Sequence, residues 1–166
     1  MKKIVFLFIA LPSLLWAQDT QPKGDFYLEN NAIVYRHIYK DSLDSASVIM
    51  QKLMAQLPAS TTINNLKEFK TEHVITGNYE TQNSTDGYPW ELLKAYFSIE
   101  IKNGKYRLTL SNIIDNQNAG TVPLTSLYVK NNPPEWRSGI DSKLAKLGTK
   151  FLNAFQLNST SGKADW

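Results

Sequence analysis

The sequence predicts an α+β protein in which two helices pack on one face of a curved antiparallel sheet. Three observations lead to this fold class: a β-hairpin with alternating apolar and polar residues, further strand-like segments before it, and two segments with apolar residues at helical spacing. The predicted order is strand, helix, four strands, helix. Since both helices can cover the one apolar face, this order predicts a two-layer sandwich.

The hairpin is the clearest element. The segment IEIKNGKYRLTLSNI folds back at residues 103–104, because Asn-Gly suits the two positive-φ positions of a type I′ turn. Counting outward from the turn, Ile101 faces Tyr106 and Ile99 faces Leu108. One face is then apolar and the other polar, so the sheet should be covered on one side only. The apolar face comprises Ala95, Phe97, Ile99, Ile101, Tyr106, Leu108 and Leu110, and the polar face comprises Tyr96, Ser98, Glu100, Lys102, Arg107, Thr109 and Ser111.

The N-terminal half supplies a strand, a helix and two weaker strands. Residues 33–40 are rich in β-branched and aromatic side chains and predict the first strand, but both of its faces carry apolar groups, so its buried face stays open. Asp41 is a candidate N-cap for the helix that follows, and Pro58 ends that helix. Weaker strand patterns cover 61–69 and 73–81. The apolar stripe of the helix is formed by Leu43, Ala46, Met50, Leu53, Met54 and Leu57.

The chain after the hairpin is irregular until the last helix. Residues 122–129 predict either a short edge strand or an ordered crossing, because Pro123 cannot donate a hydrogen bond within a central strand. The last helix carries lysines on one side and an apolar stripe on the other. That stripe consists of Ile140, Leu144, Leu147, Phe151, Leu152 and Phe155.

The first 17 residues have the layout of a secretory signal peptide. Lys2 and Lys3 precede an apolar run over residues 4–15, and Ala17 is a small residue at the expected cleavage point. A membrane-spanning helix is the alternative, but it needs about 20 apolar residues, and Pro12 interrupts this shorter run. We therefore expect cleavage after Ala17, and a soluble periplasmic or secreted protein without a membrane span after signal removal.

The remaining length suits one domain. We assign residues 18–31 to a flexible leader, 32–157 to a single α+β domain and 158–166 to a disordered tail. The chain has no cysteine, so neither disulfides nor a lipid-modified cysteine are expected.

The charge of the chain argues against a nucleic-acid partner. The formal net charge of +3 falls to +1 when Lys2 and Lys3 leave with the signal, and no basic run remains. The partner expected from the sequence is instead an unknown small molecule or a protein of the cell envelope.

No catalytic or metal-binding motif is found, and no cofactor is expected. His37 and His73 lie on predicted strands and would meet beside Glu72 only if those strands pair, and their spacing matches no ligand motif. We favour ordinary strand histidines. Glu100 faces Arg107 across the hairpin and is expected to form a structural ion pair. Glycoside hydrolysis requires two carboxylates that flank a cleft. The candidates for such a pair are Asp86, Glu91 and Glu100.

Three aromatic residues are the candidate ligand or partner surface. Tyr88 and Trp90 precede the hairpin and Trp136 precedes the last helix, in loop-like sequence flanked by polar groups. The alternative, which we favour, is that these aromatic side chains close the open ends of the sandwich.

Three segments carry a resemblance to a known family: AIVYRHIY before a helix, HVITGNYE, and FSIEIKNGKYRLTLSNI. On these segments, roughly over residues 33–112, the chain resembles the uncharacterised exported bacterial domains that have a TATA-box-binding-protein-like (TBP-like) fold. The resemblance implies the same order of strand, helix, four strands and helix. It implies no activity and no functional residues, and residues 122–136 have no counterpart in it.

Two functions remain as hypotheses. The first is a non-catalytic binding or interaction module of the envelope, which uses the polar sheet face or the groove between the sheet and the last helix. The second is an enzyme acting on envelope material, with a histidine and a carboxylate brought together from distant strands. Convergence of His37 or His73 with an acid inside a cleft would favour the enzyme.

Overall fold

One antiparallel sheet forms the body of the protein. The computed structural model of the chain describes residues 22–41, 43–83, 91–116, 122–131 and 133–157. Six strands follow one another in the order β1-β2-β6-β5-β4-β3, and the two-residue strand β7 (Val122–Pro123) pairs with β6. The six strands are β1 (Phe26–Glu29), β2 (Ala32–Lys40), β3 (Ile63–Phe69), β4 (Val74–Asn83), β5 (Glu91–Lys102) and β6 (Lys105–Asn116).

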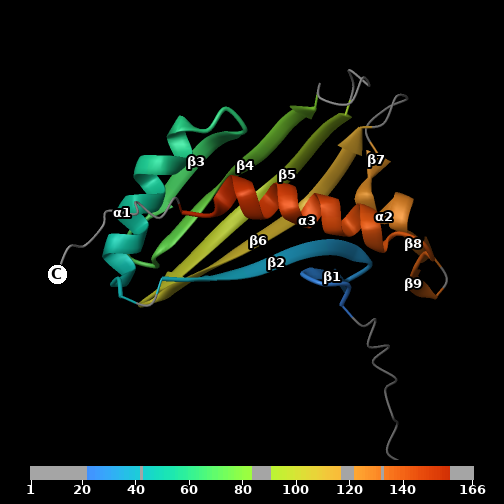
Figure 1. Ribbon diagram of the computed structural model, residues 1–166, viewed down its shortest axis with the longest axis horizontal. Helices are drawn as coiled ribbons and strands as arrows, with labels where there is room; N and C mark the ends of the chain where they lie inside the picture. The colour runs from blue at the N-terminus through green and yellow to red at the C-terminus, as the bar shows by residue number, and fades with distance from the viewer. Residues whose placement is uncertain (1–21, 42, 84–90, 117–121, 132, 158–166) are drawn as a thin grey trace, which may run out of the picture.

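Two helices lie on the same face of this sheet (Figure 1). They are α1 (Ala46–Gln56), which continues into the short 3₁₀ helix η1 (Leu57–Ala59), and α3 (Asp141–Phe155). The predicted two-layer α+β sandwich is therefore confirmed. None of the helices within the described residues is both long and apolar enough for a membrane span. The predicted signal peptide and C-terminal tail lie outside the described residues.

The hairpin of β5 and β6 has the predicted register. Ile101 pairs with Tyr106 and Ile99 pairs with Leu108, and the register shifts only between Lys94 and Tyr96. Every residue of the predicted apolar face is buried. The turn also holds α1 in place, because Asn103 Oδ1 accepts a hydrogen bond from the Ala46 amide over 2.9 Å.

The first described segment corrects a prediction. Residues 26–29, which we expected within a flexible leader, form β1 and pair with β2. The turn between them places Asn30 and Asn31 at φ 49° and 61°, a conformation that asparagine tolerates better than most residues. The Phe26 ring is buried and packs edge-on against Tyr35, with ring centroids 5.0 Å apart.

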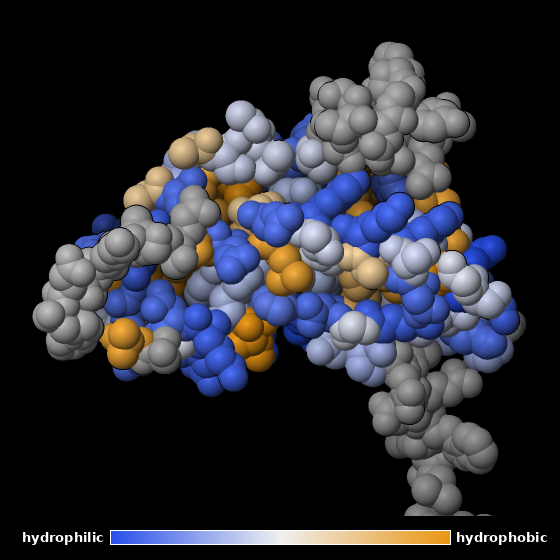
Figure 2. All heavy atoms as spheres, in the orientation of Figure 1, coloured by the Kyte–Doolittle hydropathy of each residue, from blue (hydrophilic) through white to orange (hydrophobic). Residues whose placement is uncertain are grey.

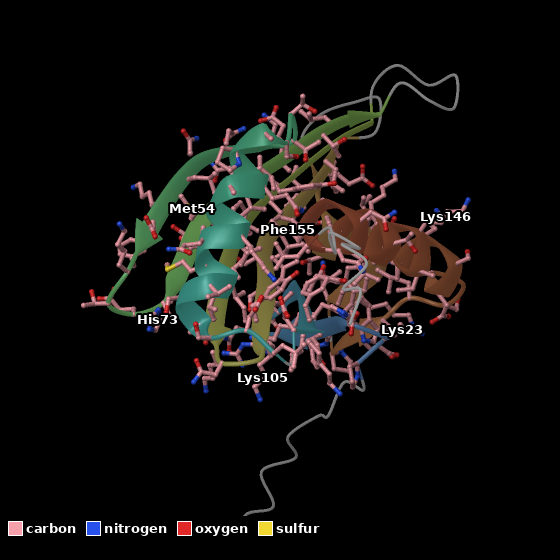
Figure 3. The ribbon with its side chains drawn as sticks, turned by 60° about the vertical axis from the view of Figure 1, so that its left-hand side comes forward. Lys23, Met54, His73, Lys105, Lys146 and Phe155 are labelled. Atoms are coloured by element: carbon pink, nitrogen blue, oxygen red, sulfur yellow. The ribbon has the colours of Figure 1, made fainter. Side chains whose placement is uncertain are left out.

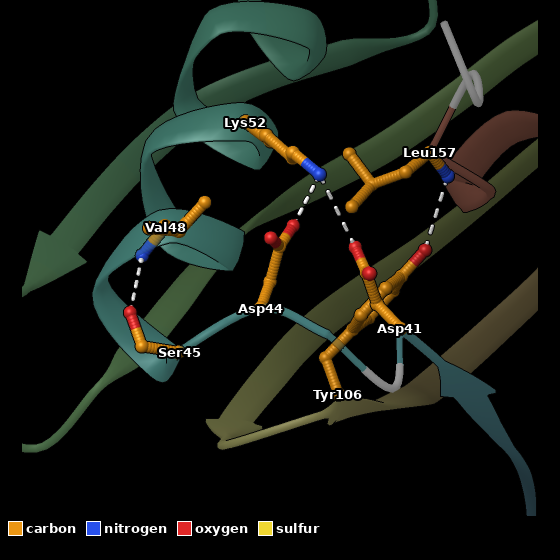
Figure 4. A network of polar contacts seen from close by, with 7 residues as sticks. All are labelled: Asp41, Asp44, Ser45, Val48, Lys52, Tyr106 and Leu157. Carbon is orange, nitrogen blue, oxygen red and sulfur yellow. Dashed lines mark hydrogen bonds and ion pairs between the residues drawn. The ribbon is translucent and has the colours of Figure 1, made fainter. Parts of the chain in front are cut away.

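The start of α1 also differs from the prediction. The N-cap is Ser45, whose hydroxyl accepts a hydrogen bond from the Val48 amide, and Asp41 instead forms an ion pair with Lys52 together with Asp44 (Figure 4). Leu43, which we placed on the apolar stripe, precedes the helix and is 95% exposed. Residues 41–45 include four residues that could cap the helix, interrupted by Leu43. The position of the cap is therefore decided by contacts with the hairpin turn rather than by residue type.

The helix α3 packs its predicted apolar stripe against the sheet. Ring centroids of Phe151 and Tyr35 lie 5.0 Å apart, and those of Phe155 and Phe97 are also separated by 5.0 Å. The end of α3 is fixed by Tyr106, whose hydroxyl donates to the Phe155 carbonyl and accepts from the Leu157 amide (Figure 4). The outer surface of this helix is mainly hydrophilic (Figure 2).

Residues 122–129 contain both predicted alternatives. After β7, residue Pro123 is the N-cap of the short helix α2 (Leu124–Tyr128), which crosses the end of the sheet. The chain then forms a separate two-stranded sheet, β8 (Val129–Asn131) with β9 (Pro134–Trp136).

Candidate functional site

A pocket of about 320 Å³ lies between the N-terminal turn and α3. One wall is formed by residues 23–26 and by Tyr35 of β2. The other wall is one stripe of α3, with Leu144, Ala145, Gly148, Thr149 and Leu152. The pocket thus occupies part of the groove between the sheet and the last helix.

A tight turn positions the charged residues of the first wall. The amide of Lys23 donates to the Phe26 carbonyl over 2.9 Å, and the Phe26 amide donates back to Lys23 over 3.1 Å. Gly24 has φ 60°, as the first central residue of a type II′ turn requires. The Asp25 carbonyl then accepts from the Arg36 amide over 2.8 Å, so Asp25 is fixed beside β2.

Tyr35 supplies a buried hydroxyl whose hydrogen-bonding capacity is not fully used. Its side chain is 0% exposed, and its hydroxyl makes no hydrogen bond of normal geometry to any described residue, although the Asp25 carboxylate lies close to it. Leaving such a group unpaired costs about 1–3 kcal/mol. Burial, and then the nearby Asp25 carboxylate, raise the pKa of the Tyr35 hydroxyl well above its usual range. The group is therefore a neutral hydroxyl that can donate and accept.

Two polar contacts involve the charged residues that line the pocket. Lys23 Nζ lies 2.6 Å from Asp141 Oδ1, which joins the turn to the first residue of α3. His37 Nδ1 lies 2.7 Å from Asp25 Oδ2, within hydrogen-bond distance, and both side chains are partly exposed. The His37 ring also packs edge-on against Tyr39. A carboxylate with a bound histidine therefore stands at one pocket wall.

Gly148 leaves unfilled space on the helical wall, and Gly148→Ala should stabilise the protein. A Cβ built at this position would lie 3.6 Å from the Phe26 ring and 3.8 Å from the Tyr35 ring, which is ordinary van der Waals contact. Because alanine favours the helix over glycine by about 0.5–1 kcal/mol, we expect the free energy of unfolding to rise by about that amount. Urea unfolding measures it, and a variant less stable than the wild type contradicts the packing described.

The polar sheet face is less suited to ligand binding, because its arginines Arg36 and Arg107 are already paired with carboxylates. Arg36 donates to both carboxylate oxygens of Glu29, and its guanidinium lies 5.6 Å from the centre of the Tyr27 ring. Hydrogen bonding to Arg36 lowers the pKa of Glu29. Arg107 donates to Glu100 over 2.7 Å and 2.8 Å, which confirms the predicted ion pair.

Among the aromatic residues singled out in the sequence, only Trp136 can be placed, and it does not line this pocket. Tyr88 and Trp90, like Asp86, lie outside the described residues. Trp136 lies on β9 opposite Val129 and is partly buried against the core. The role of the three aromatic residues as a ligand or partner surface stays a prediction.

The two histidines are far apart. His37 lies on β2 and His73 directly before β4, and β6 and β5 separate these strands. Three strand spacings correspond to about 14 Å, so the rings do not meet. No cluster of three or more potential ligands for a metal ion is found within the described ranges. His37 instead meets Asp25, which lies within the segment expected to be a flexible leader.

The comparisons with known proteins concern the fold. No protein-family model matches the sequence, and no curated protein matches it. A TBP-like protein from Parabacteroides distasonis is 14% identical, with a TM-score of 0.53 over 78% of this chain and 96% of that one. A DUF4468 family protein from Bacteroides ovatus is 12% identical, with a TM-score of 0.56 over 82% of this chain and 94% of that one. The chain therefore has the TBP-like fold that the sequence resemblance implied.

Proposed function

We propose that this protein is an exported, non-catalytic binding module of the bacterial envelope that holds a small molecule between its N-terminal turn and α3. The observation that carries the proposal is the Tyr35 hydroxyl, which is fully buried, makes no hydrogen bond of normal geometry and belongs to a pocket wall. A ligand would supply the missing hydrogen-bond partner. Export rests on the signal-peptide layout of residues 1–17.

The pocket has the composition of a small-molecule site. Phe26, Leu144 and Leu152 provide apolar surface, while Asp25 and Tyr35 provide polar groups close to one another. Binding sites for small molecules combine mostly apolar walls with a few placed polar groups. The volume of about 320 Å³ is at the lower end of the usual range, roughly 300–1,000 Å³.

Native mass spectrometry of protein purified from the bacterial envelope without denaturation tests this function. We expect a mature chain that begins at Gln18 and carries a non-covalent small-molecule adduct. The variant Ala145→Trp should lose the adduct, because Ala145 is exposed and lines the pocket. Lys146→Trp is the matched control, since Lys146 extends away from the body of the protein (Figure 3) and does not line the pocket. A bare wild-type mass, or an adduct that persists in Ala145→Trp, contradicts the proposal.

The contact between His37 and Asp25 favours a second candidate, an enzyme acting on envelope material. A carboxylate that holds a histidine ring is a common arrangement for general acid–base catalysis. Here the pair stands beside the pocket, with the carboxylate in its wall. Thr149, a hydroxyl residue of the opposite wall, donates its proton to the Ala145 carbonyl. If the adduct proves to be a reaction product that disappears in His37→Gln, the enzyme replaces the binding module.

A further inference from the structure

We propose that the pocket selects a small organic ammonium ion, an amine with an apolar or aromatic body. This inference rests on the proposed function and names the chemical class of its ligand. It follows from the charges of the pocket wall, from the unpaired hydroxyl and from the apolar surface beside them.

The charges of the wall leave one carboxylate facing the pocket. Lys23 and Asp141 neutralise one another at 2.6 Å, so neither supplies a net charge. Asp25 uses its Oδ2 atom in the contact with His37. A carboxylate has two oxygens and can accept several hydrogen bonds, so Asp25 can still accept from a ligand that donates them. An ammonium group suits this carboxylate in two ways. Its charge is opposite to that of the carboxylate, and all of its polar hydrogens can be donated in hydrogen bonds.

The Tyr35 hydroxyl adds a second acceptor beside this carboxylate. Asp25 and Tyr35 line the same pocket, and the Asp25 carboxylate helps to raise the pKa of the Tyr35 hydroxyl. An N–H group can donate to the hydroxyl oxygen, while the hydroxyl proton can turn towards Asp25. The ligand would thereby satisfy the buried atom that the protein leaves unpaired.

The remaining wall suits an apolar body. Phe26 and Leu144 are buried, and Leu152 is partly buried. Gly148 presents no side chain between them, and Ala145 presents only a methyl group. A compact aromatic or branched aliphatic group therefore fits the pocket better than a sugar or a phosphate ester.

Three probes of similar shape but different charge test whether the pocket selects a cation. We would titrate the purified protein with 2-phenylethylamine, 2-phenylethanol and 3-phenylpropionate, and follow the backbone amide signals of Gly24 and Gly148 by NMR. The amine should bind at least about tenfold more tightly than the alcohol or the acid, as expected for a hydrogen bond to a charged group. Equal binding of the alcohol, or tighter binding of the acid, overturns the inference.

Variants that remove one charged or polar group each show which residues contact the amine. Asp25→Asn should weaken amine binding by about tenfold or more, and Tyr35→Phe should weaken it to a smaller extent. Lys23→Gln should tighten binding, because it frees the Asp141 carboxylate. Lys146→Gln is the control and should leave the affinity unchanged. If Asp25→Asn binds the amine as well as the wild type does, the assignment of Asp25 is wrong.

The two proposals fail in different ways. If native mass spectrometry finds an adduct but no probe moves the Gly24 and Gly148 signals, the ligand class is wrong and the binding function stands. A bare mass together with no response to any probe removes both.

Discussion

Replacing Phe151 with alanine should lower the free energy of unfolding by about 3–5 kcal/mol, the usual cost of removing a fully buried aromatic side chain. Phe151 is 0% exposed and is the residue of α3 that lies among three aromatic rings. Its ring centroid is 5.0 Å from that of Tyr35, 5.5 Å from Tyr79 and 6.3 Å from Phe26. Removing the Phe151 ring leaves a cavity in the core between these three rings.

Urea unfolding followed by circular dichroism measures this loss as a lower midpoint at unchanged slope. Lys146→Ala on the exposed side of the same helix is the control, and it should change stability by less than about 0.5 kcal/mol. A Phe151→Ala variant within about 1 kcal/mol of the wild type would show that α3 does not hold the sheet as described.

Gly77→Ala should destabilise the protein by about 1–3 kcal/mol, as overpacking of a tight core does. Gly77 pairs with Phe97 across β4 and β5. A Cβ at this position would lie 2.7 Å from Phe97 Cζ and 3.0 Å from the backbone oxygen of Asn64. The Phe97 ring cannot move away freely, because it is 0% exposed and packs against Phe155.

The same substitution at Gly148 provides a matched control with the opposite expected sign, because its new methyl group meets only ordinary contacts. Adding Phe97→Leu to Gly77→Ala should recover part of the loss, since the smaller side chain removes the clash, and the two effects should then be non-additive. Thermal and urea unfolding of the wild type, the two single variants Gly77→Ala and Phe97→Leu, their double variant and Gly148→Ala measure these differences. A Gly77→Ala protein as stable as the wild type would contradict the close approach of Phe97.

The parts of the fold that the sequence predicts are those set by local chemistry. The Asn-Gly turn at 103–104 fixes one register, and strict alternation then decides which side chains of β5 and β6 are buried. The stripe of α3 is equally local, because each of its residues from Leu144 to Phe155 follows the helical period.

The parts that it does not predict depend on contacts between distant segments. β1 is too short to show an alternation, and it is held by pairing with β2 and by the burial of Phe26 against Tyr35 and Phe151. The N-cap of α1 is likewise chosen by the turn residue Asn103, which binds the Ala46 amide.

The candidate site is hidden from the sequence for the same reason. Asp25 lies in the turn before β1 and meets His37 of β2, and Tyr35 joins them to a helix that begins more than 100 residues later. The one local signal is the pair Gly24-Asp25, which is typical of a turn. Packing decides whether the Tyr35 hydroxyl finds a hydrogen-bond partner, and the residue pattern of the sequence does not predict this.

A crystal structure of the protein purified from the bacterial envelope, without added ligand, is the most direct test of the pocket as a binding site. We expect electron density for a small molecule between residues 23–26 and α3, with a polar atom about 2.7–3.2 Å from the Tyr35 hydroxyl. Ordered water alone on that hydroxyl, or a pocket closed by its own side chains, would contradict the binding function.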